Sequence, residues 1–497
     1  MKHPLVYELN TRCWLRSLSD RAGRRLTLGE VPETELDFWQ EMGFTHLWLM
    51  GVWTVGAGSR AEATGNAVLR RDCSRVLPDL VESDLGGSPY AIAAYEVSAE
   101  LGGDAGLDRL RRQLRGRGVK LMLDFVPNHV GLDHPWVTAH PEWFVHSRTR
   151  RPGTFRVKSG DRTLWVAHGR DPHFPPWGDT AQLDFRSAAL RRSLIESLHS
   201  VCARGDAVRC DMAMLSLNEV FARTWSGFPG GDAPPPGEFW AEAIQSTRGA
   251  FPEVCFLAEA YWGREPELVS LGFDYVYDKA WYDHLVAGRS VEAGQHLRSL
   301  PVDLVRHGAR FLENHDELRA AGLLTLPAHR AAALATIGLP GLRLLHEGQL
   351  TGARKRCPVQ LLRRPAEPVD PIVEAMYARL LGASMGTSVG RGEGQVLTAR
   401  PSWEGNPSHQ HLLLVQWQDR GPEFDLVAVN LAPHRCQGFA PISVPGLSRG
   451  NWRFEDLLGD ERFERDGAGL SRQGLYLDVA GHAAQLFHVR PVRPPGR

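Results

Sequence analysis

The chain has 497 residues, of which 43% are hydrophobic and 23% are charged. This length predicts roughly two to four structural units around a sizeable core. The 57 basic and 58 acidic residues leave a net charge of −1, so no overall field favours nucleic acid or an anionic membrane as a partner.

The cysteines and the N-terminus indicate the compartment. Seven cysteines are scattered along the chain, without a CxxC pair or a Cys/His cluster. Such usage is typical of reduced thiols rather than of a disulfide framework or a zinc site. The N-terminal segment MKHPLVYELN has no apolar stretch of the signal-peptide kind, and nowhere do about 18 apolar residues run together. We therefore expect a cytoplasmic protein without a membrane partner.

Short apolar runs alternate with amphipathic helical stretches from the N-terminus to about residue 385. Continuous apolar runs suit strands that are buried on both faces, and apolar residues recur at helical spacing between them. Eight strands, each followed by a helix, predict a closed (β/α)8 TIM barrel, with a doubly wound open sheet as the alternative. The expected strands are 5–9, 45–50, 119–126, 207–212, 254–259, 273–278, 309–313 and 342–345, and helical stretches include 107–117, 187–203, 239–250 and 328–337.

Two segments break this alternation. The stretch 131–184 is rich in His, Trp, Arg and Pro and lacks helical periodicity, so we expect a small inserted domain there. After about residue 388, short strands separated by Gly, Pro, Asn and Asp predict an antiparallel β-domain. The expected division is a barrel from 1–130 and 185–387, an inserted domain at 131–184 and a C-terminal domain at 388–497.

Polar side chains stand at the ends of the predicted strands, where a (β/α)8 barrel places its active site. Three carboxylates, Asp211, Glu259 and Asp316, follow the fourth, fifth and seventh strands. A single acid at a strand end is usually a solvated loop charge. Three at one barrel mouth indicate catalysis.

The motifs at these strand ends resemble the signature regions of the α-amylase family of glycoside hydrolases. That family's four regions are similar, in order, to DFVPNH (124–129), AVRCDMA (207–213), LAEAYW (257–262) and FLENHD (311–316), and a fifth resembles AQLDF (181–185). The resemblance covers nearly the whole chain and implies an inserted domain after the third strand and a C-terminal β-sandwich. The four regions are specific for the family and unspecific for the substrate.

The resemblance implies a role for each polar residue at the mouth. Retaining cleavage needs two carboxyl groups about 5 Å apart, and by resemblance these are the nucleophile Asp211 and the general acid/base Glu259. Arg209 would keep Asp211 ionised, and neighbouring carboxylates would raise the pKa of Glu259 so that it can donate a proton. The other implied roles are ring binding by Asp316, His129 and His315, stacking under the ring by Tyr90, and pairing of Asp124 with Arg209.

Aromatic and metal-binding roles extend this list. Trp53 and Trp262 lie just past strand ends, where a flat ring can meet a sugar face. The chemistry requires no cofactor. Asn128 and Asp184 occupy positions that ligate calcium in many family members, so the resemblance also implies a structural calcium ion.

Two residues beyond the nucleophile depart from the family pattern. Typical α-amylases carry Lys and His there and contact sugars on the leaving-group side, whereas this chain carries Met214 and Leu215. Neither side chain can hydrogen-bond a hydroxyl. The pair therefore predicts a drier surface that favours short oligosaccharides and transfer to a sugar acceptor.

Three functional hypotheses follow. The first is a retaining enzyme that cleaves or transfers α-glucosidic linkages, chiefly α-1,4, of malto-oligosaccharides or α-glucan through a glycosyl-Asp211 intermediate. The second is a glucosyl or maltosyl transferase, or a phosphorylase-type enzyme, on a small disaccharide or activated sugar. The third is a non-catalytic sugar-binding scaffold, although such relatives normally lose a catalytic carboxylate. Water, sugar and phosphate all remain open as acceptors.

Overall fold

The computed structural model describes residues 3–230 and 237–492 of the chain. Eight strands close into a barrel, and each pairs in parallel with two neighbours. The predicted closed barrel is confirmed, and the open sheet is excluded. The barrel strands are β1 (Leu5–Asn10), β2 (His46–Met50), β5 (Lys120–Phe125), β11 (Ala207–Cys210), β12 (Cys255–Ala258), β13 (Tyr275–Tyr277), β14 (Gly308–Arg310) and β15 (Leu342–His346).

Side chains alternate along each barrel strand between the barrel interior and the layer of helices. In β1, Val6 belongs to the inner apolar cluster, whereas Tyr7 belongs to the outer one. Ala207 and Leu257 also belong to the inner cluster. The residues two positions later, Arg209 and Glu259, therefore point into the barrel near its carboxyl end.

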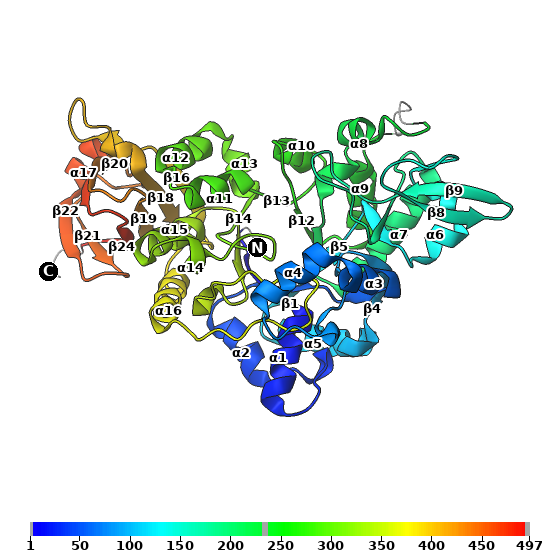
Figure 1. Cartoon of the computed structure of the whole chain (residues 1–497). Coiled ribbons are helices and arrows are strands. Elements are labelled where there is room, and N and C mark those ends of the chain that lie inside the picture. Colours follow the sequence, from blue (N-terminus) through cyan, green and yellow to red (C-terminus); the bar gives the residue numbers. More distant parts are fainter. Residues whose placement is uncertain (1–2, 231–236, 493–497) are drawn as a thin grey trace.

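Helices surround the barrel (Figure 1). The first, α1 (Thr11–Ala22), begins where the Asn10 side chain accepts a hydrogen bond from the backbone N–H of Cys13, which satisfies an otherwise free donor. It ends at Gly23, whose φ of 65° lies in the left-handed region that favours glycine.

In the described ranges, no helix has both the length and the apolar character needed to cross a membrane. Further helices are α2 (Glu33–Glu41), α3 (Ala57–Gly65), α4 (Ala67–Val76), α5 (Gly103–Gly116), α7 (Ala188–Arg204), α8 (Asn218–Trp225), α9 (Phe239–Ala250), α10 (Glu265–Ser270), α11 (Lys279–Val286), α12 (Ser290–Ser299), α13 (Val302–His307), α14 (Ala320–Leu323), α15 (Leu326–Gly338) and α16 (Pro371–Met385).

The segment between β5 and α7 departs from the barrel pattern. It holds one short helix, α6 (Pro135–Ala139), a two-stranded antiparallel pair and a three-stranded antiparallel sheet. Figure 1 shows β8 and β9 at the end of the molecule opposite the C-terminal strands. The pair is β6 (His129–Gly131) with β10 (Thr180–Gln182), and the sheet is β7 (His146–Ser147), β9 (Arg162–Ala167) and β8 (Thr154–Ser159).

The C-terminal part is a β-sandwich. Leu414 from its larger sheet and Leu477 from its smaller sheet belong to one apolar core. The indole N–H of Trp417 donates to the carbonyl of Gly338 at 2.7 Å and so joins the sandwich to α15. The end of the expected domain, 493–497, lies outside the described residues. The larger sheet is β16 (Glu393–Leu397), β18 (Leu412–Gln418), β19 (Phe424–Asn430), β24 (Ala484–Pro491), β21 (Asn451–Asp456) and β22 (Arg462–Asp466), and the smaller is β17 (Arg400–Pro401), β20 (Cys436–Ala440) and β23 (Leu475–Val479).

Candidate active site

Arg209 lies at the centre of the carboxylate cluster in the barrel mouth. Its Nη1 donates to Asp211 Oδ1 at 2.6 Å, and its Nη2 donates to Glu259 Oε2 at 2.7 Å. The same Nη1 lies 3.6 Å from Oδ1 of Asp124. Arg209 is fully buried, and Asp211 and Glu259 are only 6% and 3% exposed. One buried cation therefore holds both expected reacting carboxylates and the expected partner Asp124.

The backbone beyond β11 and β12 fixes these two carboxylates relative to each other. The N–H of Glu259 donates to the carbonyl of Cys210 at 3.0 Å, and the N–H of Ala213 donates to the carbonyl of Glu259 at 3.1 Å. Met212, which follows Asp211, has a φ of 43°, a conformation that is uncommon for residues other than glycine. This turn aims the N–H of Met212 at Glu259 Oε2, 2.7 Å away.

Glu259 has the environment of a group that exchanges a proton near neutral pH. Burial raises its pKa to about 7, Arg209 opposes the rise, and the charge of Asp211 adds to it. The largest cause is therefore burial and not the neighbouring carboxylates. Burial also raises the pKa of Asp211, while Arg209 lowers it. The hydroxyl of Tyr261 donates to Glu259 Oε1 at 2.7 Å and fixes the second oxygen of that carboxyl group.

His315 connects the third carboxylate to the barrel interior. Its Nε2 lies 3.1 Å from Asp316 Oδ2, and its Nδ1 lies 2.5 Å from Glu8 Oε1. Tyr90 places its hydroxyl 2.9 Å from the same Nε2 and stacks on the ring at 5.4 Å. Burial lowers the pKa of His315, but the charges of Asp316 and Glu8 outweigh it and raise the pKa well above the usual range.

Asp316 is the carboxylate that reaches solvent at the mouth. Its side chain keeps 49% of its surface exposed. Burial acts to raise its pKa, but the charge of His315 overcomes this and lowers the pKa to about 2. Asp316 is therefore ionised at neutral pH and available to polar groups that enter the mouth.

Neither Glu8 nor Tyr261 is among the site residues expected from sequence. Glu8 is fully buried in β1, and a charge inside an apolar strand is costly unless it is paired. The acid Glu8 inside the apolar segment LVYELN could therefore have indicated that a buried polar group pairs with it. Tyr261 follows Glu259 by two residues, and nothing in its sequence context predicts the contact.

The other expected sugar contacts occupy three different environments. Trp262 is 42% exposed and meets the ring of His173 edge-on at 4.9 Å. His129 is buried, and burial lowers its pKa to about 4, so it is neutral at the mouth. Trp53 is only 2% exposed and donates its indole N–H to the carbonyl of Asp124 at 2.8 Å. The expectation for Trp53 is therefore corrected, because its ring belongs to the core and not to a sugar surface.

Met214 and Leu215 also differ from the expectation. They lie in a short 3₁₀ helix, Ala213–Ser216, and are 0% and 3% exposed. Both belong to the main apolar core. The predicted apolar surface at the mouth is wrong, because neither side chain reaches solvent.

Asn128 and Asp184 do not fit a calcium ion. Both carboxylate oxygens of Asp184 accept hydrogen bonds from Arg186, at 2.7 and 2.6 Å. The Oδ1 of Asn128 accepts from the amide of Gln182 at 3.1 Å. Within 3–230 and 237–492, no group of three or more His, Cys, Asp or Glu side chains is arranged to hold a metal. Calcium needs several free oxygen ligands, whereas a guanidinium already neutralises Asp184.

Comparisons with known proteins agree with this geometry. The family model of the α-amylase catalytic domain matches residues 33–173. In these residues the chain is therefore similar to the catalytic domain of the α-amylase family. The α-amylase MalA of Haloarcula japonica is 25% identical over 299 residues, which cover 56% of this chain and 39% of that protein.

Two further similar proteins match almost the whole length of the chain. The α-1,4-glucan:maltose-1-phosphate maltosyltransferase of Rhodospirillum rubrum is 25% identical over 504 aligned residues, which are 96% of this chain and 64% of that protein. The solved structure of the maltogenic α-amylase AmyB from Thermotoga neapolitana has a TM-score of 0.67 at 18% identity, and the match covers 98% of this chain and 99% of that one. The structural likeness shows the fold. The chain spans less than two thirds of the length of the first two curated relatives.

Proposed function

We propose that this protein is a retaining enzyme that cleaves or transfers α-glucosidic linkages, chiefly α-1,4, in malto-oligosaccharides or α-glucan. The observation that carries the proposal is the hydrogen bonding of Asp211 and Glu259 to the same buried guanidinium of Arg209. Retention requires two neighbouring carboxyl groups, one that attacks and one that exchanges a proton. Asp316, ionised and exposed beside them, supplies the acceptor for ring hydroxyls.

In the first step, Glu259 gives its proton to the glycosidic oxygen while Asp211 attacks the anomeric carbon. The bond between this carbon and the leaving oxygen breaks, and its electron pair goes to that oxygen. Arg209 stays bonded to both carboxyl groups and balances the negative charge that moves from Asp211 to Glu259. The product of this step is a glycosyl ester of Asp211.

In the second step, the carboxylate of Glu259 takes a proton from an acceptor hydroxyl. The acceptor oxygen attacks the anomeric carbon, and the ester bond to Asp211 breaks with its electron pair returning to the carboxylate. A pKa of about 7 suits Glu259 to both directions of proton transfer. Water as acceptor gives hydrolysis, and a sugar hydroxyl gives transfer.

A second candidate function uses the same carboxylates with a different donor or acceptor. It is a glucosyl or maltosyl transferase or a phosphorylase-type enzyme on a small activated sugar. The maltosyltransferase of R. rubrum, which matches 96% of this chain, supports this alternative. A non-catalytic scaffold is disfavoured because Asp211, Glu259 and Asp316 are all present. We also propose a cytoplasmic location, which the seven free thiols support.

The test is incubation of the purified protein with maltoheptaose, with and without inorganic phosphate, followed by chromatography of the products. A hydrolase should give only oligosaccharides shorter than maltoheptaose, whereas a glucanotransferase should also give longer ones. If glucosyl or maltosyl phosphate forms only when inorganic phosphate is added, the reaction is of the phosphorylase type. Asp211→Asn is the control, with kcat reduced by at least about 10³-fold because covalent catalysis is lost. No reaction of the folded wild-type protein with any of these substrates would contradict the proposal.

A further inference from the structure

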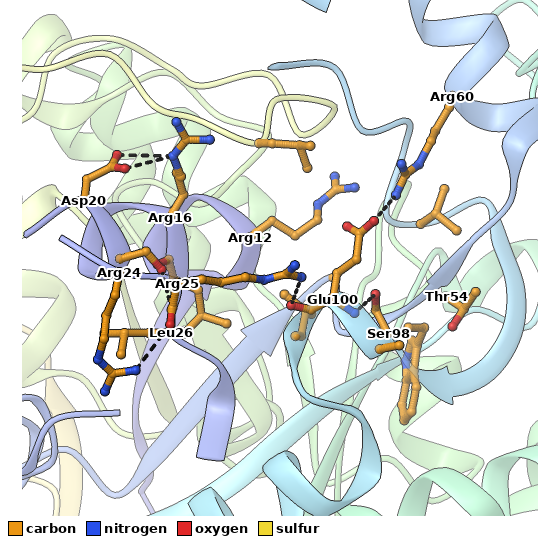
Figure 2. Close-up of a pocket in the computed structure, with 18 of the residues that line it drawn as sticks. Arg12, Arg16, Asp20, Arg24, Arg25, Leu26, Thr54, Arg60, Ser98 and Glu100 are labelled. Carbon is orange, nitrogen blue, oxygen red and sulfur yellow. Dashed lines mark hydrogen bonds and ion pairs between the residues drawn. The ribbon is translucent and has the colours of Figure 1, made fainter. Parts of the chain in front are cut away.

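A second cavity lies beside the carboxyl ends of β1 and β2, and none of the catalytic carboxylates lines it. Its volume of about 860 Å³ is in the range of small-molecule sites. Five arginines and two carboxylates line it, and a third carboxylate, Glu30, pairs with one of these arginines from outside the lining, so positive charge is in excess by two. The arginines are Arg12, Arg16, Arg24, Arg25 and Arg60 (Figure 2).

Three of the five arginines have carboxylate partners. These ion pairs are surface contacts that solvent screens. They are Arg16 with Asp20 at 3.0 Å, Arg24 with Glu30 at 2.7 Å and Arg60 with Glu100 at 3.3 Å. The remaining positive charge of the pocket is therefore concentrated on Arg12 and Arg25.

Within the described residues, the guanidinium groups of Arg12 and Arg25 hydrogen-bond only to backbone carbonyls. Arg12 Nη2 donates to Gly87 at 3.0 Å and to Val359 at 2.5 Å, and Arg25 Nη2 donates to the carbonyl of Glu100 at 2.8 Å. Neither forms an ion pair with a carboxylate of the described part of the chain. The Nε of Arg12 is enclosed without a hydrogen-bond partner, and burial lowers the pKa of this side chain to about 10. An enclosed cation without a counter-charge is costly, and a bound anion would offset that cost.

We infer that this pocket binds a small phosphomonoester, specifically a sugar phosphate, through Arg12 and Arg25. In Figure 2 the side chains of Arg12 and Arg25 reach toward Glu100, whose carboxylate pairs with Arg60. A guanidinium group presents two parallel N–H donors that match two phosphate oxygens. A phosphate dianion therefore matches the excess positive charge better than a single carboxylate does.

The rest of the lining suits the sugar part of such a ligand. The apolar side chains of Leu15 and Leu26 form part of the wall, and the hydroxyls of Thr54 and Ser98 lie in the same lining. Sugars have apolar faces and hydroxyl edges, so a mixed lining matches them.

The pocket is connected to the active site through Arg12. This side chain holds the carbonyls of Gly86 and Gly87, a few residues before Tyr90, which contacts His315. It also holds Val359, close in sequence to Arg356, whose Nη1 donates to the carbonyl of Asp316 at 3.1 Å. A phosphate bound at Arg12 would compete with these carbonyls. A ligand at Arg12 would therefore act on contacts that hold the two segments next to the barrel mouth.

Isothermal titration calorimetry with glucose 6-phosphate tests the site directly, and it requires no turnover. We expect a dissociation constant of about 1 mM or tighter at physiological ionic strength, and no binding of glucose. Arg25→Gln, at an exposed position, and Arg12→Gln should each weaken binding at least about tenfold, because each removes a charge-assisted contact. Arg75→Gln is the matched control, since this exposed arginine pairs with Asp72 outside the pocket and should leave binding unchanged.

Three results would overturn the inference. The first is that glucose 6-phosphate does not bind. The second is that Arg12→Gln and Arg25→Gln both bind it as tightly as wild type. The third is that Asp211→Asn abolishes binding, which would place the ligand in the catalytic site. Inorganic phosphate is the comparison ligand. Tighter binding of glucose 6-phosphate supports the sugar phosphate, whereas binding of inorganic phosphate alone would assign the pocket to the free ion and contradict it. Because the readout is binding, failure here is distinct from failure of the proposed reaction.

Discussion

In the proposed mechanism Asp211 and Glu259 have different tasks, although both bond to Arg209. Asp211 meets the guanidinium through a single oxygen, so its other oxygen is the one available for attack on a bound sugar. Glu259 also accepts from Met212 and Tyr261. A carboxyl group held at both oxygens has a fixed direction for proton transfer. This is the property that a general acid/base needs.

Replacement of the proton donor should affect substrates according to their leaving groups. Glu259→Gln cannot protonate a sugar leaving group, whereas an aryl α-glycoside expels a phenolate that needs no proton. We expect kcat/KM for maltoheptaose to fall by at least about 10²-fold more than for the aryl substrate. Steady-state kinetics on both substrates is the measurement, and equal losses would assign Glu259 another role.

We expect Glu8 to act as a positioning residue through His315. Protonated His315 pairs with Asp316, and Glu8 is one of the charges that raise its pKa. In Glu8→Gln the pKa of His315 falls, so the imidazolium is lost earlier as pH rises. We expect the pKa of His315, followed by NMR titration of its imidazole, to be lower in Glu8→Gln than in wild type.

The control for this prediction is Glu347→Gln. Glu347 is another buried acid, and it pairs with Arg364 instead of with the histidine. Its replacement should lower stability and leave the pKa of His315 unchanged. An unchanged pKa of His315 in Glu8→Gln, with only a uniform loss of activity, would show a merely structural role.

At the scale of the elements, hydrophobic periodicity predicts most of the fold. The helix at 239–250 has the bounds of α9 (Phe239–Ala250), and the strand at 342–345 differs from β15 by one residue. The expected strand at 309–313 corresponds to β14 (Gly308–Arg310). The expected strand includes Glu313, which lies beyond the strand end and pairs with Arg319 at 2.6 Å.

The candidate site was predictable only in part, for a physical reason. Strand alternation and the motifs place Arg209, Asp211 and Glu259 together, because neighbouring strands fix their separation. The contact of Glu8 with His315 joins residues 307 positions apart, and no local pattern predicts such a contact. Whether a Trp or Met side chain faces solvent or core depends on tertiary packing, so Trp53 and Met214 were misplaced.

Met214 should behave as a core residue. Met214→Ala removes a fully buried side chain and should lower the free energy of unfolding by about 2–5 kcal/mol, measured by denaturant titration. The ratio of transfer to hydrolysis in a maltotriose digest should stay unchanged. Met385→Ala is the matched control, because Met385 is 42% exposed and its loss should be small. A changed product ratio with unchanged stability would restore a role for Met214 at the mouth.

At the scale of the whole molecule, the buried acid/base makes stability depend on pH. Burial raises the pKa of Glu259 from 4.5 to about 7, so the folded state binds more protons than the unfolded state between these values. Its contribution is present below about pH 4.5 and is lost as pH rises through about 7. Glu259→Gln does not titrate, so its stability relative to wild type should increase by up to about 3 kcal/mol from about pH 5 to about pH 8.

Denaturant titrations of both proteins across this pH range check the prediction. Glu196→Gln, at an exposed position of α7, is the control and should show a constant difference from wild type. A constant difference for Glu259→Gln as well would mean that Glu259 is ionised in the folded protein throughout, which contradicts its role as proton donor.

The central claim is that a glycosyl group is carried covalently by Asp211. Glu259→Gln protein, mixed with α-maltosyl fluoride, should form the ester without needing a proton donor and release it slowly. The account predicts a tryptic peptide spanning 210–223 that is heavier by one maltosyl unit, with tandem mass spectrometry locating the added mass on Asp211. The account would be contradicted by a maltosyl group on any other residue. It would also be contradicted if all of the fluoride were converted to β-maltose without a trapped peptide.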